Sequence, residues 1–143
     1  MNAENISSII KVINGGIEFY ESAIEKVDSN PIKNVFKSMV LARKNALVKL
    51  QPFAKISEGE RETGSALTVK AREVYTEVMG ALTSDTEHTY IEQLEEVEDK
   101  TLEEIQSALE ENPDARYAAT LREVYHEMKL CHDRMLNLQE VTA

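Results

Sequence analysis

The sequence predicts an all-α protein, in which four long helices form a bundle and a shorter helix crosses over between the second and the third. Apolar residues recur at spacings of three and four along most of the 143 residues, which is the period of an amphipathic helix. Two Asn-Pro pairs follow short links, and proline in the first turn is typical of a helix start. No segment alternates apolar and polar residues as a half-buried strand does.

The first two long helices are predicted from two apolar stripes. The first stripe consists of Ile6, Ile10, Ile13, Ile17, Tyr20, Ile24 and Val27. The second helix begins at Asn30-Pro31, where asparagine is the expected N-cap, and Pro52 should end or bend it near its last turn. Its inner positions are Ile32, Phe36, Met39, Arg43, Ala46, Leu50 and Phe53.

The second half of the chain predicts three more helices. A polar loop over 58–64 precedes a shorter helix over 65–82, and Ser84 with Glu87 forms a capping box for the third long helix. The inner positions of that helix are Ile91, Leu94, Glu98, Thr101, Ile105 and Ala108. Asn112-Pro113 starts the last helix, whose inner positions are Tyr117, Leu121, Val124, Met128, Cys131, Met135 and Leu138.

The lengths of the links predict the topology. Very short links join the first helix to the second and the third to the fourth, so each pair forms an antiparallel hairpin. The helix over 65–82 and its loops are long enough to run back along the bundle, which makes the second and third long helices parallel. This is the crossover of a ferritin-like four-helix bundle, and we expect one domain over residues 1–143. A five-helix up-and-down bundle is the alternative.

Composition and net charge argue against several classes of protein. A net charge of −10 argues against nucleic acid and anionic membrane as partners. No apolar run approaches the roughly 20 residues of a membrane span, and the first residues do not read as a signal peptide. The lone Cys131 has no internal partner for a disulfide, so we expect a cytoplasmic protein in which this cysteine is a small buried apolar residue.

The charge is unevenly distributed. Residues 31–57 contain six bases and no acid, whereas residues 86–111 contain ten acids and one base. The simplest interpretation places a basic helix beside an acidic one. The alternative is that the basic second helix binds an anionic ligand or an acidic partner protein, or that copies of the chain associate into a homo-oligomer.

Several short motifs resemble one known family. They are Asn14-Gly15, Phe19 to Glu21, Arg43, Gly64-Ser65, Glu95 with Glu98-Asp99, and His132-Asp133-Arg134. Together they resemble a bacterial ferritin-like four-helix-bundle family that is catalogued as a domain of unknown function. The resemblance implies a ferritin-like fold and no established activity. The chain departs from the family in having Asn14 where aspartate is frequent and Ala71-Arg72 where a His-Arg pair is usual.

A ferritin-type di-iron site is not predicted. Such a site takes a glutamate from each of two helices and Glu-x-x-His from each of the other two, all pointing inward. The one Glu-x-x-His spacing, Glu123 to His126, faces away from the inner stripe of its helix, and the second helix has no acid or histidine. We therefore predict neither catalytic residues nor a cofactor.

Two ionisable residues nevertheless stand in the inner stripes. Arg43 and Glu98 lie at equal distances from the starts of two parallel helices, at a depth of about 18 Å. A charge left alone in an apolar core costs several kcal/mol. The sequence therefore predicts that Arg43 and Glu98 form a buried ion pair.

A second polar layer is predicted from Glu21, Glu95 and His132. These residues flank three inner stripes at depths of about 11–13 Å from one end of the bundle. We favour a hydrogen-bonded cluster that fixes the register of the helices. The alternative is a single iron, manganese or zinc ion bound by these three residues. The corresponding functions are a non-enzymatic bundle that acts through its surface or self-association, and a ferritin-like metal-binding protein with a degenerate, mononuclear site.

Overall fold

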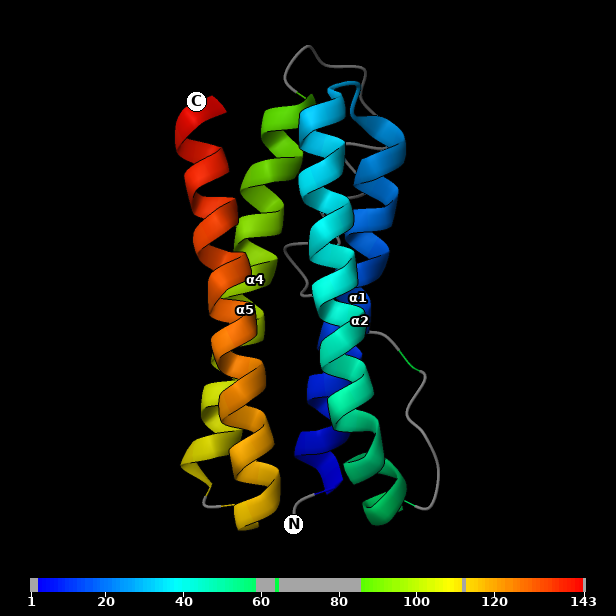
Figure 1. Cartoon of the computed structure of the whole chain (residues 1–143), viewed down its shortest axis with the longest axis vertical. Helices are drawn as coiled ribbons and strands as arrows, with labels where there is room; N and C mark the ends of the chain where they lie inside the picture. The colour runs from blue at the N-terminus through cyan, green and yellow to red at the C-terminus, as the bar shows by residue number, and fades with distance from the viewer. Residues whose placement is uncertain (1–2, 59–63, 65–85, 112, 143) are drawn as a thin grey trace.

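The computed structural model describes residues 3–58, 64, 86–111 and 113–142. Within these ranges it contains four α-helices: α1 (Ala3–Lys26), α2 (Asn30–Glu58), α4 (Thr86–Glu110) and α5 (Ala115–Thr142). They form a four-helix bundle (Figure 1), so the predicted all-α class is confirmed. The predicted crossover helix over 65–82 and the capping residue Ser84 lie outside the described residues.

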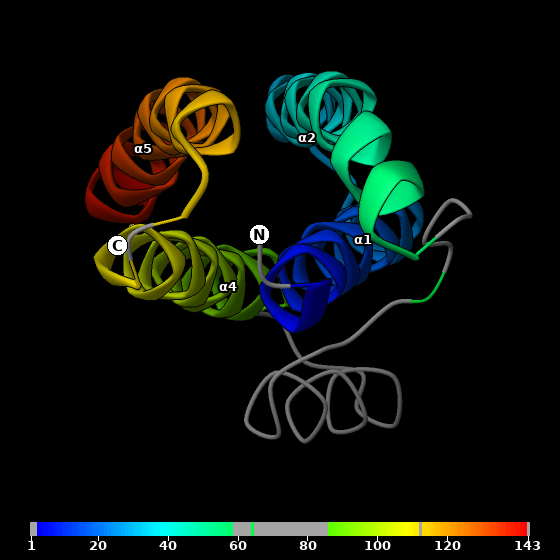
Figure 2. The same ribbon diagram turned by 90° about the horizontal axis from the view of Figure 1, so that it is seen from below.

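The four helices occupy the corners of a square when seen end-on (Figure 2). Short links make α1 antiparallel to α2 and α4 antiparallel to α5, and α1 also packs against α4 as α2 does against α5. The two diagonals are α1–α5 and α2–α4. Figure 1 shows that α2 and α4 run in the same direction, as we expect if a long connection returns the chain between them.

The inner stripes meet in one core, as predicted. Every predicted inner residue from Ile91 to Ala108 on α4 is buried, and so is every one from Tyr117 to Met135 on α5. On α1 and α2 the exceptions are Ile24 and Ile32, which are partly buried and pack against the core. Apart from Arg43 and Glu98, the Lys, Arg, Asp and Glu side chains that the structure describes are partly or fully exposed, and no described helix is apolar enough over its length to cross a membrane.

The helix ends correct two predicted helix starts and agree with the predicted bend at Pro52. Ser29, not Asn30, caps α2, because its hydroxyl accepts a hydrogen bond from the backbone N–H of Ile32 at 3.4 Å. Asp114 caps α5 in the same way, through a 3.0 Å bond from the N–H of Arg116. Pro52 does not end α2, which continues to Glu58, but the last turns lie off the axis of the preceding ones (Figure 2), so the predicted bend is present.

Candidate functional site

The middle of the bundle holds a buried ion pair between diagonal helices. Arg43 on α2 and Glu98 on α4 reach each other across the core, with Arg43 Nη2 at 3.0 Å and Nε at 3.3 Å from Glu98 Oε1. Both side chains are 0% exposed. The structure therefore brings together the two residues for which the sequence predicts a pair.

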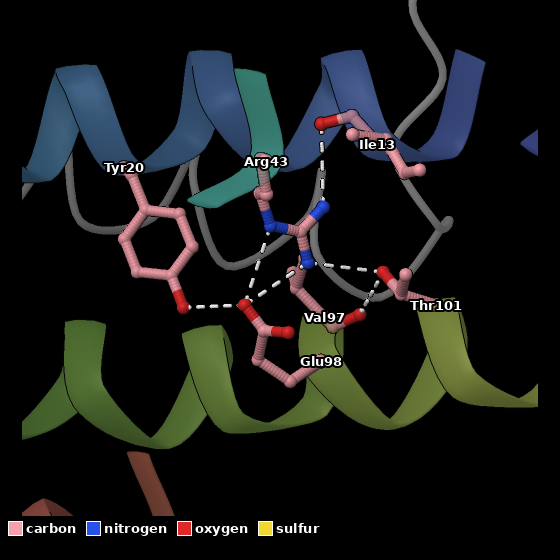
Figure 3. Close-up of polar contacts among 6 residues, drawn as sticks. All are labelled: Ile13, Tyr20, Arg43, Val97, Glu98 and Thr101. Carbon is pink, nitrogen blue, oxygen red and sulfur yellow. Dashed lines mark hydrogen bonds and ion pairs between the residues drawn. The ribbon is translucent and has the colours of Figure 1, made fainter. Parts of the chain in front are cut away.

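Two further residues add hydrogen bonds to this pair, whereas Glu98 Oε2 is buried with no hydrogen-bond partner among the described residues. We call the pair and these two residues together the central layer (Figure 3). Tyr20 on α1 donates its hydroxyl to Glu98 Oε1 at 2.6 Å. Thr101 on α4 accepts a 3.0 Å bond from Arg43 Nη2 and donates its own hydrogen to the carbonyl of Val97 at 2.9 Å. The central layer of Tyr20, Arg43, Glu98 and Thr101 thus draws on three of the four helices.

A glycine lets the guanidinium reach the backbone of α1. Arg43 Nη1 donates to the carbonyl of Ile13 at 3.2 Å, so every nitrogen of the guanidinium has a partner. A Cβ added to Gly16 would overlap the guanidinium of Arg43. Glycine inside a helix costs roughly 0.5–1 kcal/mol relative to alanine, and the close approach of Arg43 explains why the chain has one here.

The electrostatics of the central layer keep Arg43 and Tyr20 protonated. Burial lowers the pKa of the Arg43 guanidinium, but the Glu98 carboxylate together with Tyr20 raises it, and the net shift is upward. The pKa of Tyr20 is also raised well above its ordinary value, first by burial and then by the charge of Glu98. Arginine and tyrosine therefore stay protonated at neutral pH and stabilise the carboxylate, and no coordination position is left beside Glu98 Oε1.

Cys131 on α5 borders this layer. Burial, followed by the charge of Glu98, raises the pKa of its thiol to about 12. A thiol with this pKa is not a nucleophile at neutral pH. Cys131 is therefore a buried apolar residue, as the sequence predicts.

A second ionic cluster lies at the seam between α4 and α5, and we call it the seam cluster. His132 Nε2 is 2.7 Å from Asp99 Oδ1 and 3.2 Å from Glu95 Oε1. His132 Nδ1 is 3.1 Å from Asp133 Oδ1 on its other side. The imidazole thus lies among three carboxylates.

The membership of the seam cluster corrects the predicted polar layer. Glu95 and His132 meet, but Glu21 is exposed on α1 and does not join them. Depth along the bundle gave the right layer, whereas the position of the helices around the square decides which residues meet. Because α1 is diagonal to α5 (Figure 2), Glu21 has no access to the seam, and Asp99 takes the predicted place.

Of the residues that the prediction missed, each has a signal in the sequence. Asp99 follows Glu95 by four residues and therefore shares its helix face. Tyr20 and Thr101 are polar members of the predicted inner stripes, and buried polar groups need partners. His88 pairs with Glu92 at 2.9 Å, one helical turn along α4.

Comparison with known families assigns the chain to one of them. Residues 1–111 match the family described as "Domain of unknown function (DUF2383)". The chain belongs to this family. The match includes all four residues of the central layer and both carboxylates contributed by α4 to the seam cluster, and it ends before α5. No curated protein and no solved structure matches the chain.

Proposed function

We propose that this DUF2383 protein is a non-enzymatic ferritin-like bundle, one domain over residues 1–143, that acts by binding an acidic helix of another protein on α2. The parallel direction of α2 and α4 supports the ferritin-like assignment, because that fold has one long crossover between two such helices. A cytoplasmic location is part of the proposal, since a lone buried cysteine fits a reducing compartment.

The observation that carries this proposal is a solvent-facing stripe on α2. Five exposed residues at helical spacing, which we call the outer stripe, alternate cationic and apolar side chains: Lys37, Leu41, Lys44, Val48 and Lys55. Leu41 is 61% exposed and Val48 is 73% exposed. Apolar residues seven positions apart, flanked by like charges, are typical of a helix that packs against another helix.

The apolar surface continues from the outer stripe into a groove between α2 and α5. Val48 lines this groove together with Met39, Ala42 and Leu130, of which Leu130 is 58% exposed. The groove has a volume of about 490 Å³. Exposed apolar side chains around a hollow are a frequent mark of a protein interface.

The positive charge of the outer stripe indicates which kind of partner would bind there. Within the described part of the chain, no ion pair involves Lys37, Lys44 or Lys55, so an approaching acidic helix would find all three charges available. A symmetric pair of copies meeting at α2 would instead place these lysines against one another, which is unfavourable. We therefore infer an acidic amphipathic helix from a different protein.

Two synthetic helical peptides test this proposal. They share one leucine face and carry either glutamate or lysine at every polar position, and their binding is followed by fluorescence anisotropy. We expect the glutamate peptide alone to bind, with an affinity that falls as salt rises. The double variant Lys37→Glu/Lys44→Glu should weaken it at least about tenfold, a loss of 1.4 kcal/mol or more.

Controls separate charge from apolar contact and from self-association. Lys26→Glu, a matched change at an exposed lysine on α1, should leave peptide binding unchanged, whereas Val48→Ser should weaken it. Equal binding of both peptides would contradict the proposal. A mass that rises with concentration in the absence of peptide, and is restored to monomer by the double variant, would show that a second copy is the occupant.

A further inference from the structure

We propose that the seam cluster is a site for one divalent transition-metal ion, with Glu95, Asp99 and His132 as its ligands. This inference is independent of peptide binding on α2. The three ligand atoms, one from each residue, all lie within 4.8 Å of one another. Zinc bonds of about 2.0–2.2 Å in a tetrahedron place neighbouring ligand atoms roughly 3.4 Å apart, so side-chain rotation alone closes the site.

The backbone brings the ligands to the seam without strain. Glu95 and Asp99 are four residues apart on α4, so both carboxylates project from one face of the helix. His132 projects from α5, which packs directly against α4. Two carboxylates and an imidazole are a ligand set that zinc, manganese and ferrous iron accept, and the ordinary order of affinities favours zinc among these three.

The second nitrogen of His132 is held in the orientation that a metal ligand requires. Asp133 Oδ1 lies 3.1 Å from Nδ1 and accepts a hydrogen bond when the proton is on Nδ1, while Nε2 is directed at Glu95 and Asp99. Histidine ligands of metals almost always donate their other N–H in this way. In the tautomer with the proton on Nδ1, Nε2 presents a lone pair to two carboxylates, a repulsion that a cation between them would relieve.

The charge balance also favours a cation. The imidazole faces three carboxylates, and the one cation that pairs with them among the described residues is Lys129, which lies 3.2 Å from Asp133 on the side away from Nε2. Three carboxylates with one lysine leave an excess of negative charge at the seam. A divalent ion would neutralise that excess.

The exposure of the three ligand side chains would let an ion bind reversibly from solution. The side chains of His132 and Glu95 are 11% and 15% exposed, whereas that of Asp99 is 51% exposed. The ion would therefore enter past Asp99, and water would fill its remaining positions. The central layer has no such opening, because its side chains are fully buried.

Calorimetric titration of metal-free protein with Zn(II) tests the site. We expect one equivalent to bind, with protons released, and affinity to fall as pH drops because protons compete with the metal for its ligands. Asp99→Asn is the first variant, since a half-exposed residue can change without loss of folding. It and His132→Gln should each weaken binding at least about tenfold, and Asp133→Asn should weaken it by a factor within the roughly 10–100-fold range of such supporting residues.

His88 provides the matched control. It pairs with Glu92 four residues away on the same helix, so it offers an ordinary surface histidine and carboxylate. His88→Ala and Lys37→Glu/Lys44→Glu should leave zinc affinity unchanged, and the second variant separates this site from the proposed peptide surface. Absence of binding at millimolar zinc, or binding that survives Asp99→Asn and His132→Gln but disappears in His88→Ala, would overturn the proposal.

Discussion

The central layer and the seam cluster are both built on α4, yet they handle charge in opposite ways. Glu98 in the central layer is matched by an arginine and a tyrosine, and the arginine also bonds to a threonine, all within the core. Glu95 and Asp99, three residues before it and one after it, share one imidazole at the edge of the bundle. A deeply buried carboxylate must be compensated by the protein itself, whereas a carboxylate near water can stay undercompensated and available to an ion.

The largest expected effect is the loss of the cation in the central layer. Arg43→Ala should lower the free energy of unfolding by about 3–5 kcal/mol, because it leaves the Glu98 carboxylate buried without its partner. Urea denaturation measures this cost. Lys44→Ala, the next residue along and exposed, should change stability by less than about 0.5 kcal/mol. A cost below about 1 kcal/mol for Arg43→Ala would mean that water reaches the layer.

The close approach at Gly16 gives the next largest effect. Gly16→Ala should cost about 3 kcal/mol, the upper range for a methyl group forced into a packed core, because the new Cβ overlaps the guanidinium. The same change in an Arg43→Met background should be neutral, or stabilising by up to about 1 kcal/mol, since alanine favours the helix. Equal costs in the two backgrounds would show that Arg43 is not the obstacle.

The tyrosine of the central layer should matter less than the arginine. Tyr20→Phe removes a 2.6 Å hydrogen bond to a carboxylate and should cost about 1.5–2 kcal/mol. Tyr117→Phe is the matched control. The Tyr117 hydroxyl is buried with no hydrogen-bond partner among the described residues, so its removal should be neutral or slightly stabilising in the same denaturation assay. Similar costs for the two variants would remove Tyr20 from the network.

Most of the fold and one of the two charged sites, the ion pair of the central layer, were predictable from the sequence. Helical periodicity identified the inner faces, and equal depth on parallel helices brought Arg43 and Glu98 to one level. The ion pair of the central layer was predictable because inner-stripe residues in the middle of a four-helix bundle point toward the same axis. Depth alone is then enough to predict a contact.

The seam cluster was predicted only in part, for a geometric reason. At the edge of a bundle a contact depends on which two helices are neighbours, and apolar periodicity does not specify that. Glu21 has the right depth but lies on the helix diagonal to α5, so it cannot meet His132. The predicted helix starts were off by one or two residues because two residues that can cap a helix lie close together at each start. Ser29 precedes Asn30, and Asp114 follows Asn112 by two residues.

The smallest expected effect comes from a solvent-exposed ionic contact between α2 and α5. Lys49 Nζ lies 2.8 Å from Glu123 and also pairs with Glu127, and hydrogen bonds to these two carboxylates raise the pKa of the lysine. A raised folded-state pKa means that the stabilisation is complete below the unfolded value of 10.5 and is lost as pH rises through the folded value. Lys49→Met should therefore cost less than about 1 kcal/mol at pH 7, and nothing once the lysine is deprotonated in both states.

Salt should change the contribution of the exposed Lys49 ion pairs to stability but not that of the buried Arg43–Glu98 pair. At about 1 M salt the Debye length falls to about 3 Å, so the cost of Lys49→Met at pH 7 should shrink toward zero. The cost of Arg43→Ala should stay the same, because ions do not enter a layer whose side chains are 0% exposed. Denaturation of both variants at low and high salt measures the difference. A cost of Arg43→Ala that falls with salt in parallel with that of Lys49→Met would mean that the central layer is open to solvent, and the contrast between buried and exposed ion pairs in this bundle would no longer hold.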